Sequence, residues 1–573
     1  MPKPTVRIGN AQAFWGDRSD AAAELLAQEP ELDYLTLDYL AEVSMSILAS
    51  QRERDPSTGY ARDFIDVVRS LVPYWRAGGK CRLIVNAGGL NPKGCAEACR
   101  KVIEEGGCRA LKVAVVSGDD VLPALTTPPE EARELFRNLD SGAPITAVAA
   151  KLITANAYVG SAPIAASLAE GADVVITGRV ADPSLVVGAC LHHFGWRSDD
   201  WNELAGATVA GHLIECGTQV TGGIATDWLD VPDPGHLGFP IVEVSEDGSC
   251  VVTKPAGTGG EVTEATVKEQ LLYEIGDPGK YISPDVTVSF LSLKVEDLGS
   301  DRVRVSGARG GPAPETLKVS ATYRDGYWAA GTLTIVGHES RAKAERCGKI
   351  VLSRVHEAGH DLRESVVEYL GGEDRTLLRI AVAADSSAAV ERFSRELMPL
   401  ITAGPQGTTG YSDGRPRVHP QFRYWPCLIH RDAVTPRVET MTTSGTVSTS
   451  AAVPREKPKA APKPPAKAAS NIQPDPPRLL WDLARARSGD KGTSSNIGVI
   501  ARRPGGYECL KAFLTADRVA EFFKEIGVEK VTRYELPNLG ALNFVLKGIL
   551  SSPLRTDAQG KALGQMLLEM PLS

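Results

Sequence analysis

The chain has 573 residues, of which 43% are hydrophobic and 23% charged, and its formal net charge is −8. These values fit a globular protein of two or three domains, and the acidic balance excludes a broad basic face for nucleic acid. No apolar run approaches the roughly 18 residues of a membrane span, no signal-peptide core opens the chain, and the cysteines form no Cys-x-x-Cys pair, so we expect a cytoplasmic protein.

The first 190 residues alternate short apolar runs with helical patterns, which predicts βαβ units and a mainly parallel sheet. The predicted strands are Thr5–Gly9, Leu32–Leu37, Arg82–Val85, Leu111–Val116 and Ala172–Ile176. The predicted helices are Ser19–Ala27, Asp63–Arg76, Pro92–Glu105 and Ile164–Glu170. Because parallel strands end at one edge of their sheet, and ligands bind at that edge, the loops that follow these strands should form a site.

Charged residues follow two of these strands. Asp38 and Glu42 come after the second strand, and Arg179 and Asp182 come after the fifth, in Thr177-Gly-Arg-Val-Ala-Asp182. Carboxylates at such an edge can act as acid and base or hold a divalent cation. Helix capping and a structural salt bridge explain the same residues without any chemistry. We assign all four as candidate catalytic residues and leave the metal open.

Other loops offer groups that suit an anion or a polar ligand. Backbone N–H groups of Asn86-Ala-Gly-Gly89 and of Lys254-Pro-Ala-Gly-Thr-Gly-Gly260 suit a phosphate, a carboxylate or the diphosphate of coenzyme A. A hairpin or bulged turn explains the second cluster equally well. The candidate ligand-binding residues are Asn10, Asn86, Gly88, Gly89, Asn156, Lys254, Gly257 and Gly259. Asn156 lies in Thr154–Gly160, which we expect to begin a helix.

Two common enzyme classes lack their motifs in this chain. No Gly-x-Ser-x-Gly elbow or assembled Ser/His/Asp set is present, which disfavours a hydrolase triad. Gly9-Asn-Ala-Gln12 follows the first strand where a dinucleotide fingerprint would stand, which disfavours an NAD enzyme.

From about residue 200 the pattern becomes richer in strands. Period-two alternation predicts half-buried antiparallel strands, and a strand and a helix follow later. These elements are Asp285–Phe290, Arg302–Ser306, Leu317–Tyr323, Leu378–Ala383 and the helix Ala388–Leu400. We treat residues 1–441 as one large α/β unit with a β-rich extension and a sub-boundary near residue 200.

Residues 442–477 are first rich in Ser and Thr and then in Pro, Lys and Ala. Such a segment cannot bury enough apolar surface to order itself, which predicts a disordered linker. The alternative is that its lysines contact an acidic partner.

Limited proteolysis should cut the chain first within residues 442–477, because a solvated tether offers its backbone to proteases. We expect two stable fragments in a time course followed by mass spectrometry. If this segment survives while loops elsewhere are cut, it is docked on the surface and the partner-binding interpretation holds.

Residues 478–573 have the size and the mixed pattern of a small α+β domain, which we expect to be ferredoxin-like. The predicted strands are Leu479–Ala484, Ile497–Ala501, Val531–Leu536 and Ala541–Leu546, and the predicted helices are Ala516–Ile526 and Lys561–Leu568. The segment Ser488-Gly-Asp-Lys-Gly492 is predicted to be a loop, and it adds Asp490 and Lys491 to the ligand-binding candidates. We therefore expect this tail domain to complete the site.

Several longer motifs together resemble the acyclic terpene utilisation protein A family. In the large unit they are Ile8–Asn10, Asp38–Val43, Asn86–Gly89, Thr177–Asp182, Val252–Pro255 and Leu271–Pro278. In the tail domain they are Ala486–Gly492, Asn496–Val499 and Tyr534–Asn543, which resemble the small C-terminal domain of that family. The matches cover nearly the whole chain except the linker.

The resemblance implies catabolism of acyclic terpenes such as citronellol and geraniol, which proceeds through acyl-CoA intermediates and a biotin-dependent carboxylase. We expect a lyase or hydratase acting on a terpenoid or branched acyl-CoA, with Asp182 or Glu42 as base. Arg179 and the amides of Asn86–Gly89 would stabilise the enolate. The alternative is a non-catalytic scaffold or accessory subunit of an acyl-CoA carboxylase. Beyond a coenzyme A thioester substrate, the cofactor is open; we expect a homo-oligomer without nucleic-acid or membrane partners.

Overall fold

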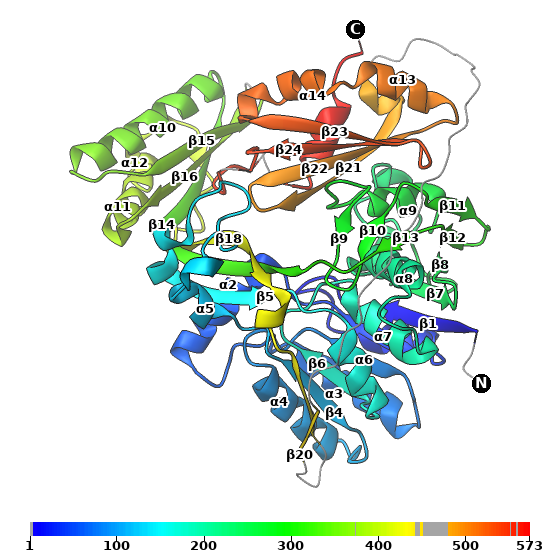
Figure 1. Cartoon of the computed structure of the whole chain (residues 1–573). Coiled ribbons are helices and arrows are strands. Elements are labelled where there is room, and N and C mark those ends of the chain that lie inside the picture. Colours follow the sequence, from blue (N-terminus) through cyan, green and yellow to red (C-terminus); the bar gives the residue numbers. More distant parts are fainter. Residues whose placement is uncertain are drawn as a thin grey trace.

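A computed structural model of the chain describes residues 4–372, 374–441, 447–450, 479–550, 552–556 and 560–572. These residues form an eleven-stranded sheet and smaller sheets of three, six and four strands. In Figure 1 the large sheet and its helices lie below, the four-stranded tail domain lies above, and an arm of helices and strands projects at the upper left.

The eleven-stranded sheet is mixed. Its five central strands run parallel, in the order β1 (Thr5–Asn10), β2 (Tyr34–Leu37), β3 (Arg82–Val85), β6 (Val174–Thr177), β4 (Val113–Ser117). Antiparallel strands extend it beyond β1 with β7 (Ile241–Ser245), β8 (Cys250–Thr253), β12 (Val303–Ser306) and β11 (Lys294–Asp297), and beyond β4 with β19 (Arg437–Met441) and β20 (Val447–Ser450). The prediction of a parallel N-terminal sheet is confirmed for the five central strands.

Helices cover both faces of these strands because the apolar residues of each strand alternate between two cores. On β3, Leu83 and Val85 pack with one set of helices, whereas Ile84 packs with the other. The first set is α1 (Ala21–Gln28), α3 (Phe64–Arg76) and α4 (Pro92–Glu105), and the second is α6 (Ala162–Ala169), α7 (Ser184–Phe194) and α8 (Trp201–Ile214). Burial of one such side chain contributes about 1.5–3 kcal/mol, so the two cores fix the register of the sheet.

The remaining helices are α2 (Glu42–Arg54), α5 (Leu122–Thr126), α9 (Glu264–Leu271), α10 (Ser340–Glu357), α11 (Ser387–Leu397), α12 (Leu400–Ala403), α13 (Gly506–Phe513), α14 (Ala516–Phe522) and α15 (Leu563–Leu568). In the part of the chain that the structure describes, no helix combines the length and the apolar character that a membrane crossing requires.

The 21-residue strand β14 (Thr316–Val336) joins the core to the arm. Its first half pairs with β5 (Leu152–Ala157) and β18 (His419–His430), and its second half pairs with β16 (Arg375–Ala384). The expectation of a helix starting within Thr154–Gly160 is wrong, because this segment continues β5 and α6 starts only at Ala162. The smaller strands are β9 (Tyr281–Ile282), β10 (Thr287–Ser289), β13 (Arg309–Gly311), β15 (Glu364–Gly371) and β17 (Thr408–Thr409).

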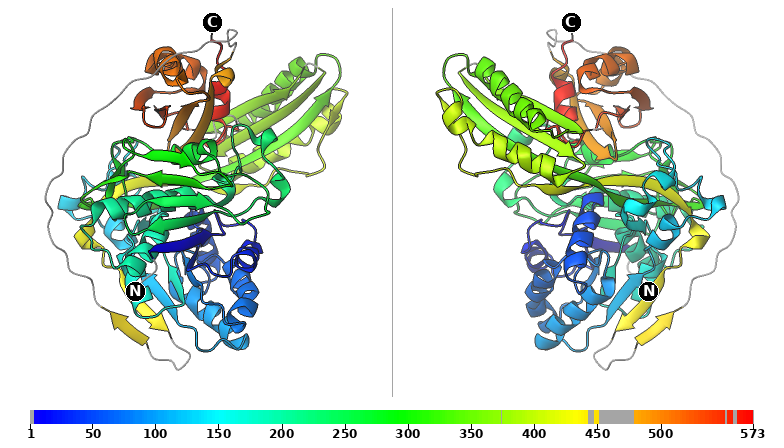
Figure 2. Two further views of the ribbon diagram at one scale, coloured as in Figure 1. Left: turned by 90° about the vertical axis from the view of Figure 1, so that its right-hand side faces the viewer. Right: turned by 90° about the vertical axis from the view of Figure 1, so that its left-hand side faces the viewer.

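The tail domain is a four-stranded antiparallel sheet with helices α13, α14 and α15 packed on it. Its strand order is β21 (Ala484–Lys491), β22 (Ser494–Ala501), β24 (Ala541–Lys547), β23 (Lys530–Leu536). The predicted first strand is wrong: Leu480–Asp482 is a short 3-10 helix. Ser488–Lys491, expected to be a loop, forms the second half of β21. Both side views in Figure 2 place this domain on top of the large unit.

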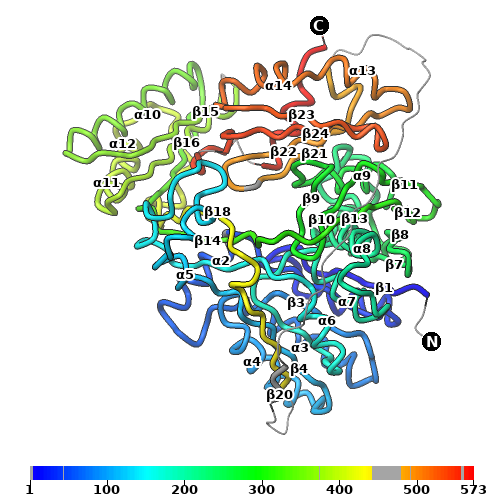
Figure 3. The backbone as a smooth tube through the Cα atoms, in the orientation of Figure 1, coloured from blue at the N-terminus to red at the C-terminus, as the bar shows by residue number. Residues whose placement is uncertain are grey.

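The chain trace in Figure 3 leads from β1 near the N-terminus at the right to the C-terminus at the top. Four residues of the predicted linker, Val447–Ser450, form the edge strand β20. The rest of the predicted linker, residues 442–446 and 451–477, lies outside the described residues.

Candidate functional site

The loops that follow the parallel strands meet at the carboxyl edge of the sheet, as the strand order requires. The Asn86 amide after β3 donates from Nδ2 to Asp38 Oδ1 after β2, over 2.6 Å. Asn86 Oδ1 accepts from the Tyr39 backbone N–H over 2.7 Å. Arg179, after β6, donates from Nη1 to the carbonyl oxygen of Leu40. Asp38, Asn86 and Arg179, three candidates taken from distant parts of the sequence, therefore lie together.

Asp38 is a buried carboxyl group, 5% exposed. Burial raises its pKa well above the ordinary range, and the negative charge of Asp182 raises it further. The positive charge of Arg179 and the hydrogen bond from Asn86 act in the opposite direction and do not cancel this rise. Asp38 therefore holds its proton more tightly than an exposed aspartate does.

Arg179 organises the edge from a position that is 2% exposed. Its Nη2 lies 3.1 Å from Asp182 Oδ1, and its guanidinium carbon lies 4.3 Å from the centre of the Tyr158 ring. A buried cation is costly unless it is paired, so Asp182, Tyr158 and the Leu40 carbonyl together compensate the charge. Both of its Nη atoms are bound to protein groups, which makes Arg179 a positioning residue.

Four partly buried side chains, here called the mouth residues, lie in front of Arg179: Glu42, Tyr158, Asp182 and Lys318. The Tyr158 hydroxyl donates to Glu42 Oε1 over 3.2 Å. Lys318 Nζ lies 4.0 Å from the same oxygen and 5.3 Å from the centre of the Tyr158 ring. The side chains of Glu42, Asp182 and Lys318 are 24%, 25% and 35% exposed, so a substrate can reach them.

Asp119, after β4, forms the floor of the site. Its Oδ2 accepts from the Arg179 backbone N–H and from Asn156 Nδ2, each over 2.8 Å. Burial raises the pKa of the Asp119 carboxyl to about 6, against the effect of these two hydrogen bonds. Asn156, a candidate from the sequence, therefore belongs to this site through Asp119.

The raised pKa of Asp119 predicts a pH dependence of stability. The folded state holds the Asp119 proton more tightly than the unfolded state, so ionisation between pH 4 and pH 6 destabilises the fold as the pH rises. A difference of about two pH units corresponds to about 3 kcal/mol. The free energy of unfolding of Asp119→Asn, relative to that of the wild type, should therefore rise by the same amount between pH 4 and pH 7. Unfolding experiments over this pH range measure the difference. A constant difference between the two proteins over this range would contradict the assignment.

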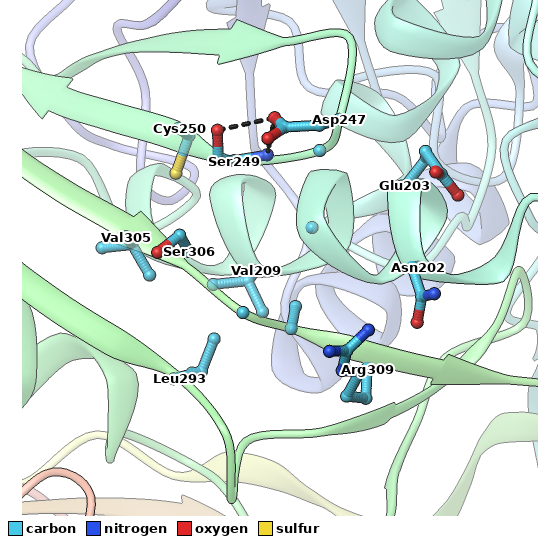
Figure 4. Close-up of a pocket in the computed structure, with 14 residues that line it drawn as sticks. Asn202, Glu203, Val209, Asp247, Ser249, Cys250, Leu293, Val305, Ser306 and Arg309 are labelled. Atoms are coloured by element: carbon cyan, nitrogen blue, oxygen red, sulfur yellow. Dashed lines mark hydrogen bonds between the residues drawn. The ribbon is translucent and has the colours of Figure 1, made fainter. Parts of the chain in front are cut away.

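A pocket of about 270 Å³ opens at the same edge. Leu90 after β3, Asp120 after β4 and Asn156 of β5 line it, so its walls continue the loops that carry Asn86 and Asp119. A second pocket of about 240 Å³ lies between α8 and the strands β8, β12 and β13 (Figure 4). Asn202, Glu203 and Arg309 line that pocket, which includes none of the candidate residues.

Asn10 and the glycines after β3 have structural roles. Asn10 Nδ2 donates to the backbone oxygens of Ile214 and Glu215, over 2.6 and 3.1 Å, which ties the end of α8 to the sheet. A Cβ atom on Gly88 would lie 2.5 Å from the Thr177 carbonyl oxygen, and one on Gly89 would lie 2.4 Å from Leu48 Cδ1. These glycines let the loop pack closely, which accounts for them without an anion.

The lysine-bearing loop after β8 lies two strands beyond β1 along the same edge. Lys254 is buried, and its Nζ donates to the Thr258 carbonyl oxygen over 2.9 Å and lies 3.1 Å from Asp301 Oδ2. Gly257 has a φ of 78°, and a Cβ atom on Gly259 would lie 2.0 Å from the Asp233 carbonyl oxygen. The lysine of this loop is bound to a carbonyl oxygen of the same loop, which favours the turn interpretation over a coenzyme A site.

The tail domain docks on the large unit and brings an arginine, Arg487, to it. Arg487 is 4% exposed; it donates from Nη1 to the Ile224 carbonyl oxygen over 2.9 Å and from Nη2 to Gln219 Oε1. Its guanidinium carbon lies 4.6 Å from the centre of the Tyr273 ring. Arg485 and Arg502 both pair with Asp227 at 2.7 Å, which fixes the domain.

Cys216 links this interface to the carboxyl edge. Burial raises the pKa of its thiol, the charges of Glu215 and Glu274 raise it further, Arg487 lowers it, and Asp38 adds a smaller rise. The thiol is thus within electrostatic reach of both Asp38 and the tail arginine.

Of the two tail residues chosen from the sequence, only Asp490 has a described side chain, and it lies within its own domain. Asp490 is exposed, and a Cβ atom on Gly560 of the same domain would lie 2.4 Å from its Oδ1. Lys491 is the last residue of β21, and its side chain is outside the described residues. Sequence reasoning missed Lys318, Asp119 and Arg487. Two of them carried a signal: Asp119 stands three residues after a predicted strand, and Arg487 lies within the motif Ala486–Gly492.

Within the described residues, no group of three or more His, Cys, Asp or Glu side chains is arranged to hold a metal ion.

Two family models match the chain. That of the acyclic terpene utilisation family protein AtuA matches residues 6–440, and that of the AtuA ferredoxin-like domain matches residues 478–573. A search of curated proteins found no match. The resemblance carried by the sequence motifs and the expected ferredoxin-like tail are confirmed. The acyl-CoA substrate, the carboxylase association and the homo-oligomer stay predictions.

Proposed function

Since the chain belongs to the acyclic terpene utilisation family AtuA, we propose that it is an enzyme of acyclic terpene utilisation that catalyses proton transfer at the carboxyl edge. The reaction class is that of a lyase or hydratase on a branched acyl-CoA. The observation that carries this proposal is the placement of the partly exposed Glu42 and Asp182 around the stack of Tyr158 on Arg179.

Carboxyl groups held in different environments suit acid–base work, because their protonation states can differ at one pH. Asp182 is held by Arg179 and would remove the proton next to the thioester carbonyl. Tyr158, hydrogen-bonded to Glu42, would deliver a proton to the departing hydroxyl group, which leaves as water. In the hydration direction the same groups act in reverse.

The enolate formed in this step needs a positive charge near its oxygen. The sequence suggested Arg179, whose Nη atoms are bound to Leu40 and Asp182. Lys318 is the better candidate, because its side chain is 35% exposed and its Nζ lies beside Tyr158 and Glu42.

The test is to incubate the protein with a branched 2,3-unsaturated acyl-CoA and to follow the gain of one water molecule by mass spectrometry. Glu42→Gln and Asp182→Asn should each lower the rate by about 10²–10⁴, the usual worth of a general acid or base. Glu105→Gln, at the exposed end of α4, is the matched control and should keep the wild-type rate.

Failure of the wild-type protein to hydrate any of a series of branched acyl-CoAs would contradict the proposal. Stoichiometric co-purification with an acyl-CoA carboxylase, together with that failure, would favour the scaffold alternative.

A further inference from the structure

The helix α2 packs on β5, β14 and β18 at the carboxyl edge. Glu42, its first residue, has Oε1 4.0 Å from Lys318 Nζ and accepts from the Tyr158 hydroxyl. Near its other end, Glu53 pairs with Arg324. Lys318 and Arg324 share one face of β14, because side chains on a strand alternate between its two faces. One ion pair at each end therefore holds the helix to this face of β14.

The face of β14 between these two ion pairs is polar. It carries Ser320 and Thr322, which are both buried. The Thr322 hydroxyl lies 2.6 Å from that of Thr154 on β5, whereas Ser320 Oγ has no hydrogen-bond partner among the described residues. On α2 itself, Gln51 Oε1 is also buried without a partner in the described part of the chain. Such groups gain hydrogen bonds to water when the helix moves away, which favours opening.

Apolar burial holds α2 less firmly than α3, although both helices have 13 residues. Among its described side chains, α2 gives only Met45 and Leu48 to the hydrophobic cores, and its Ile47 is 44% exposed. The side chains that α3 gives to the core are Phe64, Val67, Val68, Leu71, Val72 and Trp75. Because apolar burial is the main force that keeps a helix docked, α2 should open far more often than α3.

The chain on either side of α2 can act as a hinge. The helix begins after Ala41, whose side chain has no oxygen to cap it. After the helix, a turn leads to Gly59, which has a φ of 101°, a conformation that glycine adopts readily. The chain is fixed at both hinges: the Leu40 carbonyl oxygen accepts from Arg179, and the Gly59 carbonyl oxygen accepts from the Leu90 backbone N–H over 2.8 Å. The helix can therefore move between two fixed points.

We propose that α2 is a hinged lid on the carboxyl-edge site, which opens to admit the substrate and closes to bring Glu42 to Tyr158. Ala49 and Arg52 of α2 form one wall of the pocket of about 270 Å³, and Thr154 of β5 lies on another, so the pocket opens with the helix. The inference rests on the proposed function only for what enters the site, since the opening itself needs no turnover.

The test places a thiol beneath the lid. The thiol introduced by Ser320→Cys lies on the face of β14 that α2 covers, whereas the native Cys427 pairs with Val319 from β18 and belongs to the hydrophobic core. Ser320 and Cys427 are both 0% exposed. The full-length protein is treated with iodoacetamide, and mass spectrometry follows the modification of each peptide. We expect the introduced thiol to react about tenfold or more faster than Cys427, because only α2 has to open.

A second variant weakens the lid at one end. Glu53→Ala, made in the Ser320→Cys protein, removes an exposed ion pair and should speed the reaction of the introduced thiol about threefold. The rate at Cys427 should not change. The matched control is Arg69→Ala, which breaks an exposed ion pair with Asp66 within α3 and should change neither rate.

If Ser320→Cys fails to fold, hydrogen–deuterium exchange of the wild-type protein decides, and the lid requires faster exchange in α2 than in α3. Equal reaction rates of the two thiols, or equal exchange in the two helices, would overturn the inference. Opening of α2 in a protein that hydrates no branched acyl-CoA would contradict the proposed function and leave the lid standing.

Discussion

Replacing Arg179 by methionine should destabilise the protein by about 3–5 kcal/mol, the usual cost of removing one partner from a buried ion pair. The guanidinium holds Asp182, the Leu40 carbonyl oxygen and the Tyr158 ring at once, so three loops lose their common partner. The negative charge of Asp182 would also lose its counter-charge beside the buried Asp38. Chemical denaturation followed by circular dichroism measures the change.

One further variant separates charge from shape at this position, and a second serves as an exposed control. Arg179→Lys keeps the charge but has no planar fork, so it should lose part of that stability and about tenfold or more in turnover. Arg69→Met removes an exposed arginine that pairs with Asp66 within α3, and should change stability by less than about 1 kcal/mol. If Arg179→Met is as stable as wild type, Arg179 does not hold the edge together.

The second large effect is expected at the tail domain. Arg487→Met removes two hydrogen bonds from a charged donor and the stack on Tyr273, and should weaken docking by about 3–5 kcal/mol. Hydrogen–deuterium exchange should rise in β21 and in the segment around Ile224 and Tyr273, because both lose their shared contact.

Arg503→Met is the matched control, because Arg503 is an exposed arginine of the same domain. It should leave the exchange pattern unchanged. Wild-type protection at the interface of Arg487→Met would mean that Asp227, with Arg485 and Arg502, suffices to dock the domain.

The strand pattern predicted part of this arrangement because the central strands are parallel. Their ends must meet at one edge, which brought Asp38, Asn86 and Arg179 together as expected. Lys318 could not be placed in this way. It lies on β14, which pairs Val319 with Ala157 of β5, and no local pattern specifies a pairing so distant in sequence.

The error in the tail domain has a clear physical cause. The segment expected to be a loop is a strand, and side chains on a strand alternate between its two faces. One set of alternate residues faces the large unit. Arg485 pairs with Asp227, and Arg487 donates to the Ile224 carbonyl oxygen. Gly489 lies beside Glu274.

The alternate residues of the same strand face the tail domain itself. Ser488 Oγ accepts from the Gly564 backbone N–H, and Asp490 lies beside Gly560. Because the segment was predicted to be a loop, Asp490 was chosen as a candidate, whereas the strand directs Arg487 to the large unit.

Glycine-rich loops were the weakest guide. An anion-binding loop and a loop packed closely on a neighbouring strand have the same composition. Only their contacts in the three-dimensional structure distinguish them. Gly88 lies against the Thr177 backbone, and Lys254 is bound within its own loop. Both clusters are explained by packing and local hydrogen bonds.

The most direct test of acid–base chemistry at the carboxyl edge is proton exchange next to the thioester carbonyl. A saturated branched acyl-CoA is incubated with the protein in D₂O, and loss of the α-proton signal is followed by NMR. We predict exchange with the wild-type protein, a rate lower by about a hundredfold or more in Asp182→Asn, and the wild-type rate in Glu105→Gln. No exchange above the protein-free rate at saturating substrate, or full exchange in Asp182→Asn, would contradict the assignment of Asp182 as the base.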